Sequence, residues 1–429
     1  MTWLQRYRIR HRIRNSIWIL PVLGIIAALA AVPLLHAMEE ALGSKSAINP
    51  ETARAVLGTL AASMFTFIVF VCSALLVAVQ LASAQLTPRI IAIVFRDPGT
   101  KFSLTVFVFT FTFSLAVLVR INTSVPLFTT RLAAYCCLAS LGVFLYLIDH
   151  VGKTLRPSGA LRAVARLGRA VIEDVYPRRL TEAQKASQEP VAILSGEPTL
   201  TVTNLKDGVV RAVDIDGLVT LAERADCVIE MVPQVGDFIA IGDPLFRIFQ
   251  GGATLTAGDL RQSVAIGQER TLEQDPALAL RIMVDIASKG LSPAINDPTT
   301  AVLAIDQIHH LLRNVGSRNL DDERVRDAAG RVRLVYRTPA WEDFVQLAVT
   351  EIRHFGGESI QVSRRLRAML ENLIQTLPDE RAPLLRQELS LLRRSAERRF
   401  PEPEDRALAD VGDFQGVGSH CGPRPKSAN

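Results

Sequence analysis

Cysteine is scarce in this sequence, and the positions of the few that occur exclude two kinds of site. Five cysteines are spread over 429 residues, and no two of them form a C-x-x-C pair. A disulfide-stabilised domain or a cysteine-ligated zinc site needs cysteines in closer sets. The sequence therefore predicts free thiols, a reducing compartment for its soluble part and no structural metal.

Motifs that carry catalysis are missing as well. The sequence holds no Walker loop, no dinucleotide-binding glycine fingerprint, no nucleophile elbow and no H-E-x-x-H motif. Arginines in the carboxyl-terminal half are interleaved with acidic residues, which is typical of a solvated surface rather than a nucleic-acid site. We therefore expect a protein that is not an enzyme, has no cofactor and binds no nucleic acid.

Charged residues are absent from the interior of four long apolar runs, and only Asp149 marks the end of the last one. A transmembrane helix needs about 20 apolar residues, so each run predicts a span within a four-span domain over residues 16–150. A proton-coupled carrier usually has an ionisable group at mid-membrane, so this absence argues against a proton relay. The four runs are residues 16–37, 58–82, 102–119 and 132–149.

Lysine and arginine gather on one side of these runs. They are dense in the basic arm of residues 1–15, between the second and third runs, and after the fourth. By the positive-inside rule, the spans should lie in an inner (plasma) membrane with both termini in the cytoplasm. The basic flanks should also attract anionic lipid head groups. Between the second and third runs, "RIIAIVF" at 89–95 is too short to span and predicts a short interfacial helix or a cytoplasmic helical extension.

Polar residues recur every seven positions in the second span, up to Thr87 just after it. On a helix they form one stripe, and polar atoms facing lipid are costly, so the stripe should face protein or water. It fits either helix–helix packing or the lining of an ion path. Four phenylalanines in the third span (Phe107, Phe109, Phe111 and Phe113) fit a hydrophobic constriction or ordinary packing. The pore-lining candidates are Thr59, Ser63, Thr66, Ser73, Gln80 and Thr110.

The rest of the chain changes character several times. Residues 151–190 predict a linking helix, and β-branched runs with Gly and Asp turns over 191–255 predict a small β-barrel with one inserted helix. Residues 256–400 predict a helical cytoplasmic domain, and 401–429 lack periodicity and predict a disordered tail. The fold class is thus an α+β membrane protein with four transmembrane helices, then a small β-barrel-like domain and a helical cytoplasmic domain.

The stretch "SKGLSPAINDPTTAVLAIDQIHHLL" at 288–312 raises the question of a site. Asp275-Pro276 and Asp297-Pro298 each predict a helix start, with the aspartate as N-cap and the proline in the first turn. Gly290 suits the end of the first helix. Helix capping is one interpretation, and it explains the prolines. The other is an anion site, because the free N–H groups at a helix start favour anions. The ligand candidates here are Ser292, Asn296, Asp297 and Thr299.

A carboxylate precedes a histidine by three positions twice, in Asp306 with His309 and in Glu351 with His354. On a helix this spacing puts both side chains on one face, as in carboxylate metal sites. A two-metal bundle needs further inward carboxylates, which the sequence does not identify. Charge pairing on the helix surface is the preferred interpretation, with no metal site.

The segment "DIASKGLSPAINDPTTAVLAIDQI" at 285–308 resembles the signature of a bacterial family of predicted membrane proteins, domain of unknown function 2254. "VQLASAQLTPRI" after the second span and "VGDFIAIGDPL" at 235–245 also resemble elements of that family. The resemblance covers roughly residues 10–400. It implies four amino-terminal spans and a large cytoplasmic part, and it implies no catalytic residue or cofactor.

Three functions remain open on this evidence. The first is a channel-like or transport protein for small ions, regulated by its cytoplasmic part; because four spans enclose little space, it would have to be a homo-oligomer. The second is a membrane-anchored sensory or scaffold protein whose spans only pack together. The third is a membrane-tethered, metal-dependent enzyme that uses His309 and His354.

Overall fold

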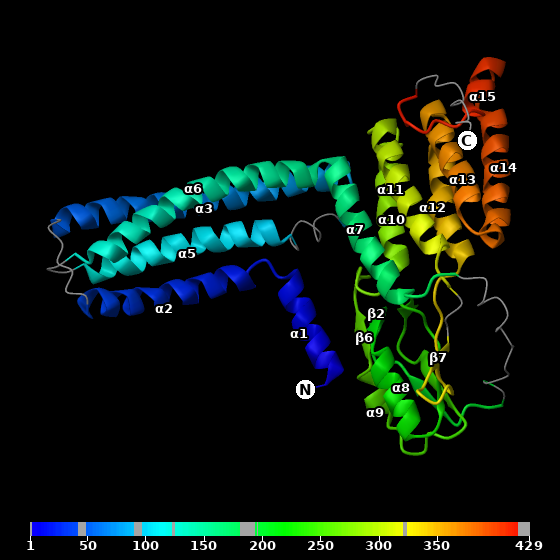
Figure 1. The fold of residues 1–429 in the computed structure, drawn as a ribbon, viewed down its shortest axis with the longest axis horizontal. Coiled ribbons are helices and arrows are strands. Elements are labelled where there is room, and N and C mark those ends of the chain that lie inside the picture. Colours follow the sequence, from blue (N-terminus) through cyan, green and yellow to red (C-terminus); the bar gives the residue numbers. More distant parts are fainter. Residues whose placement is uncertain are drawn as a thin grey trace, which may run out of the picture. The chain divides into compact units, whose positions relative to one another are not determined.

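The structure is a computed structural model that describes residues 2–41, 49–89, 97–121, 125–180, 194, 196–320 and 324–418. The chain forms two compact units, one over residues 10–160 and one that joins residues 1–9 to residues 161–429. Both divisions fall within helices, in α1 (Trp3–Asn15) and in α7 (Pro157–Val175) (Figure 1). The segment after the second span that was expected to form a short interfacial helix or a cytoplasmic helical extension lies, apart from Arg89, outside the described residues.

Four helices of the first unit are long and apolar enough to cross a membrane, which confirms the prediction of four spans. At 1.5 Å per residue, the 36 residues of the longest give roughly 54 Å, well beyond the hydrocarbon core of a bilayer. The four are α2 (Ile19–Ala41), α3 (Pro50–Gln85), α5 (Pro98–Arg120) and α6 (Leu127–Leu155). Helices α3, α5 and α6 extend beyond the predicted apolar runs at both ends, whereas α2 begins three residues after the first run begins and ends four residues beyond it.

Helix α5 is the centre of this unit and packs against α2, α3 and α6. Small residues let α2 approach it closely: a Cβ added at Gly24 would lie 3.0 Å from Cγ2 of Thr105, and Ala28, one turn on, is fully buried. Small residues at such spacing are typical of tight helix pairs in membranes. The interior of the unit is therefore packed with side chains.

The second unit holds two β-sheets that do not close into the expected barrel over its described residues. A five-stranded sheet has the order β1 (Leu200–Thr203), β5 (Pro244–Phe249), β3 (Val228–Met231), β8 (Val332–Val335), β7 (Arg324–Arg326). A three-stranded sheet has the order β4 (Phe238–Ile239), β2 (Gly208–Val213), β6 (Val264–Gly267).

Three of these strands follow residue 255, where the sequence predicted helices alone. Strand β8 pairs in parallel with β3, with Ile229 opposite Leu334, and β7 extends the sheet beyond it. Both residues of that pair are fully buried in a core shared with α8 (Ile215–Arg224) and the short α9 (Ala257–Arg261). Burial of this apolar core stabilises the sheet although its strands are far apart in the sequence.

Helices make up the rest of the second unit, as predicted. Helix α10 packs on α11 and α12, α13 packs on α11, and α14 covers α12 and α13, so that the five run side by side (Figure 1). A 3-10 turn, η2 (Asp379–Arg381), precedes the last of them. Their bounds are α10 (Pro276–Gly290), α11 (Pro298–Gly316), α12 (Trp341–Phe355), α13 (Ile360–Thr376) and α14 (Ala382–Arg399).

The expectation of disorder after residue 400 is wrong for the described part of the tail. Residues Pro403–Ala409 form α15, and the segment after it lies on α13. The Arg364 guanidinium, 1% exposed, donates to the carbonyl oxygens of Val411 and Gly418. Asp413 accepts three backbone N–H groups of the same segment. Hydrogen bonds, rather than apolar periodicity, order this segment.

Candidate functional site

The polar stripe of α3 points outward from the first unit. Its five pore-lining candidates are exposed on the single chain, although they lie on a helix that is otherwise apolar. The last residue of the seven-residue pattern, Thr87, lies beyond the end of α3 and is buried, so it does not belong to the exposed stripe. The polar stripe is therefore Thr59, Ser63, Thr66, Ser73 and Gln80.

Large apolar side chains complete this face of α3. Phe70 and Val77 fall four residues after Thr66 and Ser73, and both are more than half exposed. A coiled-coil seam consists of positions a and d of a seven-residue repeat, and each a position lies four residues after a d position. Thr66 and Ser73 correspond to d positions, and Phe70 and Val77 correspond to a positions. A groove of about 570 Å³ also runs along Ala62, Ser63, Thr66, Phe67 and Phe70. The face has the form of a helix-packing surface with polar positions at regular intervals.

Two hydroxyl groups of the stripe are satisfied within the helix. Thr59 donates to the carbonyl oxygen of Ala55 at 2.8 Å and Thr66 to that of Ala62 at 3.2 Å. Gln80 carries a primary amide, with two N–H donors and an acceptor, and it is exposed. An amide placed in hydrocarbon without partners costs several kcal/mol, so Gln80 needs water or protein beside it more than the threonines do.

Thr110 does not join this face. It is 1% exposed and lies on α5 with its hydroxyl 3.0 Å from that of Ser140 on α6. The phenylalanines of the third span are packed as well: Phe107 is fully buried and meets Phe67 of α3 edge to face at 5.2 Å. The structure thus places Thr110, Phe107 and Phe113 in the packed interior of one chain, apart from the polar stripe, whereas Phe109 and Phe111 are half-buried.

At one end of the first unit, side chains cap the ends of neighbouring helices, and the sequence did not predict these contacts. Glu39 near the end of α2 is 6% exposed and accepts hydrogen bonds from the Phe128 amide at 2.7 Å and the Thr129 hydroxyl at 2.8 Å. It caps α6, whose own N-cap residue, Pro126, has no side-chain cap. A carboxylate is also favoured there by the helix dipole.

A second cap at this end joins α3 to α5. Arg54 donates from Nε and Nη2 to the carbonyl oxygen of Ile121, at 2.9 and 2.6 Å, where α5 ends. At the opposite end of α5, Asp97 accepts from the Thr100 amide and from Nε2 of His150 at 2.7 Å. The Glu39, Arg54 and His150 contacts join residues far apart in the sequence and leave no local signal.

The "SPAINDP" stretch joins α10 to α11, and hydrogen bonds account for two of its four candidate residues. Asp297 accepts from the Thr300 amide and hydroxyl as the N-cap of α11, and the Ser292 hydroxyl donates to the Lys289 carbonyl oxygen. Asn296 has φ 47, a left-handed conformation that asparagine tolerates. Asn296 and Thr299 are exposed. The geometry supports the capping interpretation for Asp297, whereas the Ser292 hydroxyl is bound locally without capping a helix start.

The carboxylates of the two Asp/Glu-x-x-His pairs bind arginines. Glu351 forms a bidentate pair with Arg281, with both N–O distances 2.7 Å, and the guanidinium lowers the pKa of that carboxyl. Asp306 binds Arg365 at 2.6 Å. Among the described residues, no group of three or more His, Cys, Asp or Glu side chains is placed to hold a metal ion.

Neighbouring groups also fix the histidine of the first pair. Nε2 of His309 lies 2.9 Å from Oδ1 of Asn372, and burial lowers the pKa of this histidine. The imidazole is thus favoured in its neutral form and held against α13. The carboxylates of the two motifs are thus paired with arginines of other helices rather than with the histidines three residues on.

Comparison with known proteins agrees with this architecture. The family model described as "Predicted membrane protein (DUF2254)" matches residues 14–372. Two uncharacterized proteins, one of Mycobacterium bovis and one of Mycobacterium tuberculosis, are each 26% identical over 422 residues, covering 94% of this chain and 80% of the relative. No solved structure matches the chain. A match over most of the length, together with the four membrane-length helices, shows that this chain belongs to the DUF2254 family of predicted membrane proteins.

Proposed function

We propose that this protein forms a homo-oligomer in the bacterial inner membrane, in which the polar stripes of several α3 helices line a path for small ions. Both termini would lie in the cytoplasm, and the second unit would regulate the path without catalysing a reaction. The observation that supports this most is the exposure of all five members of the stripe on the single chain. A polar stripe that faces lipid is unfavourable, so it needs water or another protein surface.

The packed interior of the first unit favours a path between chains over a path within one. Phe107, Phe113 and Val117 are at most 1% exposed and pack around α5, so side chains fill the centre of the described helix bundle. Copies arranged about α3 would bring their seams together in a closed ring. Ser63, Ser73 and Gln80 would then face the axis at successive depths.

A membrane-anchored scaffold is the second candidate, and one observation favours it. The hydroxyl donors of Thr59 and Thr66 are already satisfied by their own helix, so these residues can pack dry against a neighbouring helix. In that case copies would still associate through α3, and no ion would pass. The two candidates therefore differ in flux and not in association.

The experiment is ion flux through purified full-length protein in liposomes, beside the double variant Ser73→Leu, Gln80→Leu. We expect the variant to lower flux at least tenfold or to change ion selectivity, because leucine removes the polar atoms and narrows the path. Cys72→Leu is the matched control, since Cys72 is exposed at the same depth of α3 but turned away from the stripe. Its flux should equal that of the unsubstituted protein.

Two results would count against the ion path. Equal flux in the double variant and the control would show that ions do not pass along the polar stripe. No flux at any voltage, pH or salt concentration, from protein that still associates, would favour the scaffold. A strictly monomeric protein in lipid would refute both candidates.

A further inference from the structure

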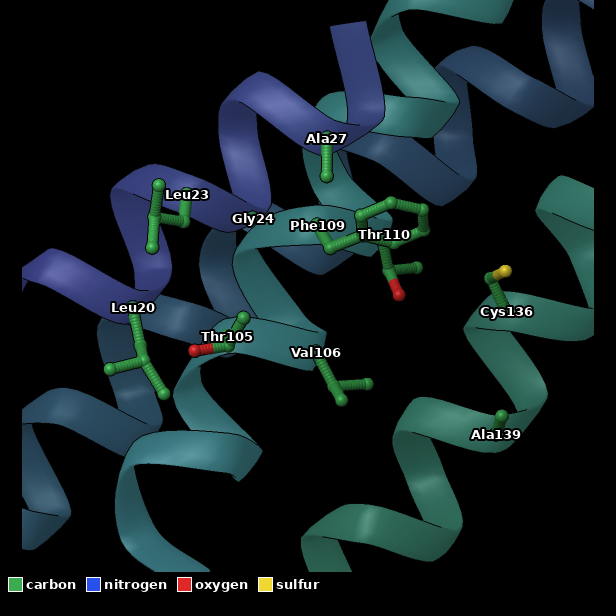
Figure 2. Close-up of a pocket in the computed structure, with 10 residues that line it drawn as sticks. All are labelled: Leu20, Leu23, Gly24, Ala27, Thr105, Val106, Phe109, Thr110, Cys136 and Ala139. Carbon is green, nitrogen blue, oxygen red and sulfur yellow. The ribbon is translucent and has the colours of Figure 1, made fainter. Parts of the chain in front are cut away.

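A second surface of the membrane unit is hollowed, and it lies on helices other than α3. Helix α2 packs closely on α5 but touches α6 much less, and a groove of about 500 Å³ is left over α5 between them. Figure 2 shows Leu20, Leu23 and Ala27 on α2, with Cys136 and Ala139 across from them on α6. This volume lies within the range of about 300–1,000 Å³ that is usual for small-molecule sites.

The lining of this groove suits hydrocarbon and little else. Gly24, Val106 and Phe109 continue the apolar surface. The two threonine hydroxyls of the lining have partners, since Thr105 donates to the carbonyl oxygen of Lys101 at 2.8 Å and Thr110 lies 3.0 Å from the Ser140 hydroxyl. A polar ligand would lose its hydration here without gaining hydrogen bonds. An apolar chain would lose nothing.

One end of the groove reaches the level of the head groups. Trp18, 60% exposed, precedes Leu20 of the lining by two residues, and tryptophan is enriched at the membrane–water interface. From Lys101 to Thr110 the groove side of α5 then runs inward for roughly 13 Å, a depth that suits an acyl chain. The groove thus opens at the interface and extends into the hydrocarbon core.

Positive charge lies at that same end. Lys101 is 5% exposed, one turn before Thr105 on the same face of α5, and its Nζ donates to the carbonyl oxygen of Arg14 at 2.6 Å. The side chains of Arg10, Arg12 and Arg14 are exposed on the preceding helix. The Lys101–Arg14 contact brings the basic helix to this end of α5, and ammonium and guanidinium groups complement a phosphate diester.

We propose that this groove is a binding site for an anionic phospholipid, with one acyl chain along α5 and the phosphate beside Lys101 and Arg14. Charge favours a lipid over a second copy of the chain as the occupant. Copies share one orientation in the membrane, so a second copy in the groove would place its own basic arm at the same depth, where like charges repel.

The test is native mass spectrometry of the full-length protein in mild detergent, with phosphatidylglycerol and phosphatidylcholine of equal acyl chains. We expect one phosphatidylglycerol retained per chain, in preference to phosphatidylcholine. Ala139→Trp, which fills the groove from α6, should lower retention at least tenfold. Leu141→Trp is the control, because Leu141 is exposed on the same helix but does not line the groove. Arg14→Gln should reduce the preference for the anionic lipid.

Photo-crosslinking adds a readout that needs no variant. A phosphatidylglycerol with a photoreactive group in its acyl chain should label peptides that contain Leu20–Ala27 and Cys136–Ala139 in the unsubstituted protein. Three results would overturn the proposal: equal lipid retention in Ala139→Trp and Leu141→Trp, equal retention of both lipids by the unsubstituted protein, or efficient disulfide cross-linking between Cys136 residues of two copies.

Discussion

Two aspartates begin neighbouring helices by the same Asp-Pro device, and their different surroundings predict different costs of removal. Asp275 is 2% exposed, caps α10 through the Leu278 amide and accepts from Nε and Nη2 of Arg270 at 2.7 and 3.0 Å. The side chain of Asp297 caps α11, and both of its hydrogen bonds are with Thr300, one with the amide and one with the hydroxyl. We therefore expect Asp275→Ala to destabilise its helix more than Asp297→Ala does.

The magnitudes follow from the contacts that each variant removes. Loss of an N-cap costs about 1 kcal/mol, which is the whole expectation for Asp297→Ala. Asp275→Ala also removes charge-assisted hydrogen bonds to a partly exposed arginine, worth about 2 kcal/mol more. That difference corresponds to roughly a thirtyfold change in an equilibrium constant, since about 1.4 kcal/mol is tenfold.

Hydrogen exchange read by mass spectrometry on the full-length protein in detergent measures the effect locally, as the opening of α10 and α11. Asparagine keeps the cap but not the charge, so Asp297→Asn should leave exchange of α11 unchanged, whereas Asp275→Asn should still speed exchange of α10. Equal effects of the two alanine variants would refute the reasoning. Unchanged exchange in Asp297→Asn together with lost ion flux would show that Asp297 does more than cap a helix.

Three further predictions concern other parts of the chain. Glu39→Ala should lower the stability of the first unit by about 2–3 kcal/mol, seen as a lower Tm in detergent, because a buried carboxylate that caps α6 is lost; an unchanged Tm would contradict this. Burial lowers the pKa of His309, so the unfolded chain binds more protons below pH about 6.5 and stability falls on acidification; His309→Gln should show a smaller drop in Tm from pH 7.5 to pH 5, and an equal drop would refute it. Truncation after Asp410 removes carbonyl oxygens that Arg364 binds, so exchange in α13 should rise at least tenfold, and unchanged exchange would contradict this.

Local pattern was enough to predict a large part of the fold. Apolar runs predicted the four spans, and the Asp-Pro pairs predicted the starts of α10 and α11. Both signals depend only on residues that are neighbours in the sequence. The seven-residue interval gave the polar stripe from Thr59 to Gln80. Its direction could not be predicted, since which face of α3 meets α5 depends on the other helices.

The remaining features depend on contacts between residues far apart in the sequence, and local pattern did not predict them. Strand β8 joins β3 through a parallel pair of Ile229 and Leu334, and its four residues resemble many helical segments when read alone. The tail after Ala409 was predicted to be disordered because its order comes from hydrogen bonds with Arg364 rather than from apolar periodicity. The groove over α5 also has no local signature, since three helices form it.

The caps that Glu39 and Arg54 provide have a consequence for how the protein is made. Each closes the end of a helix synthesised later, so both side chains enter the membrane before their partners exist. Helix α6 leaves the translocon with free amide groups at its start, and they find a carboxylate only when α2 is beside it. Helix α6 is thus the one that completes the bundle, and a chain without it would leave the Glu39 carboxylate without its partners.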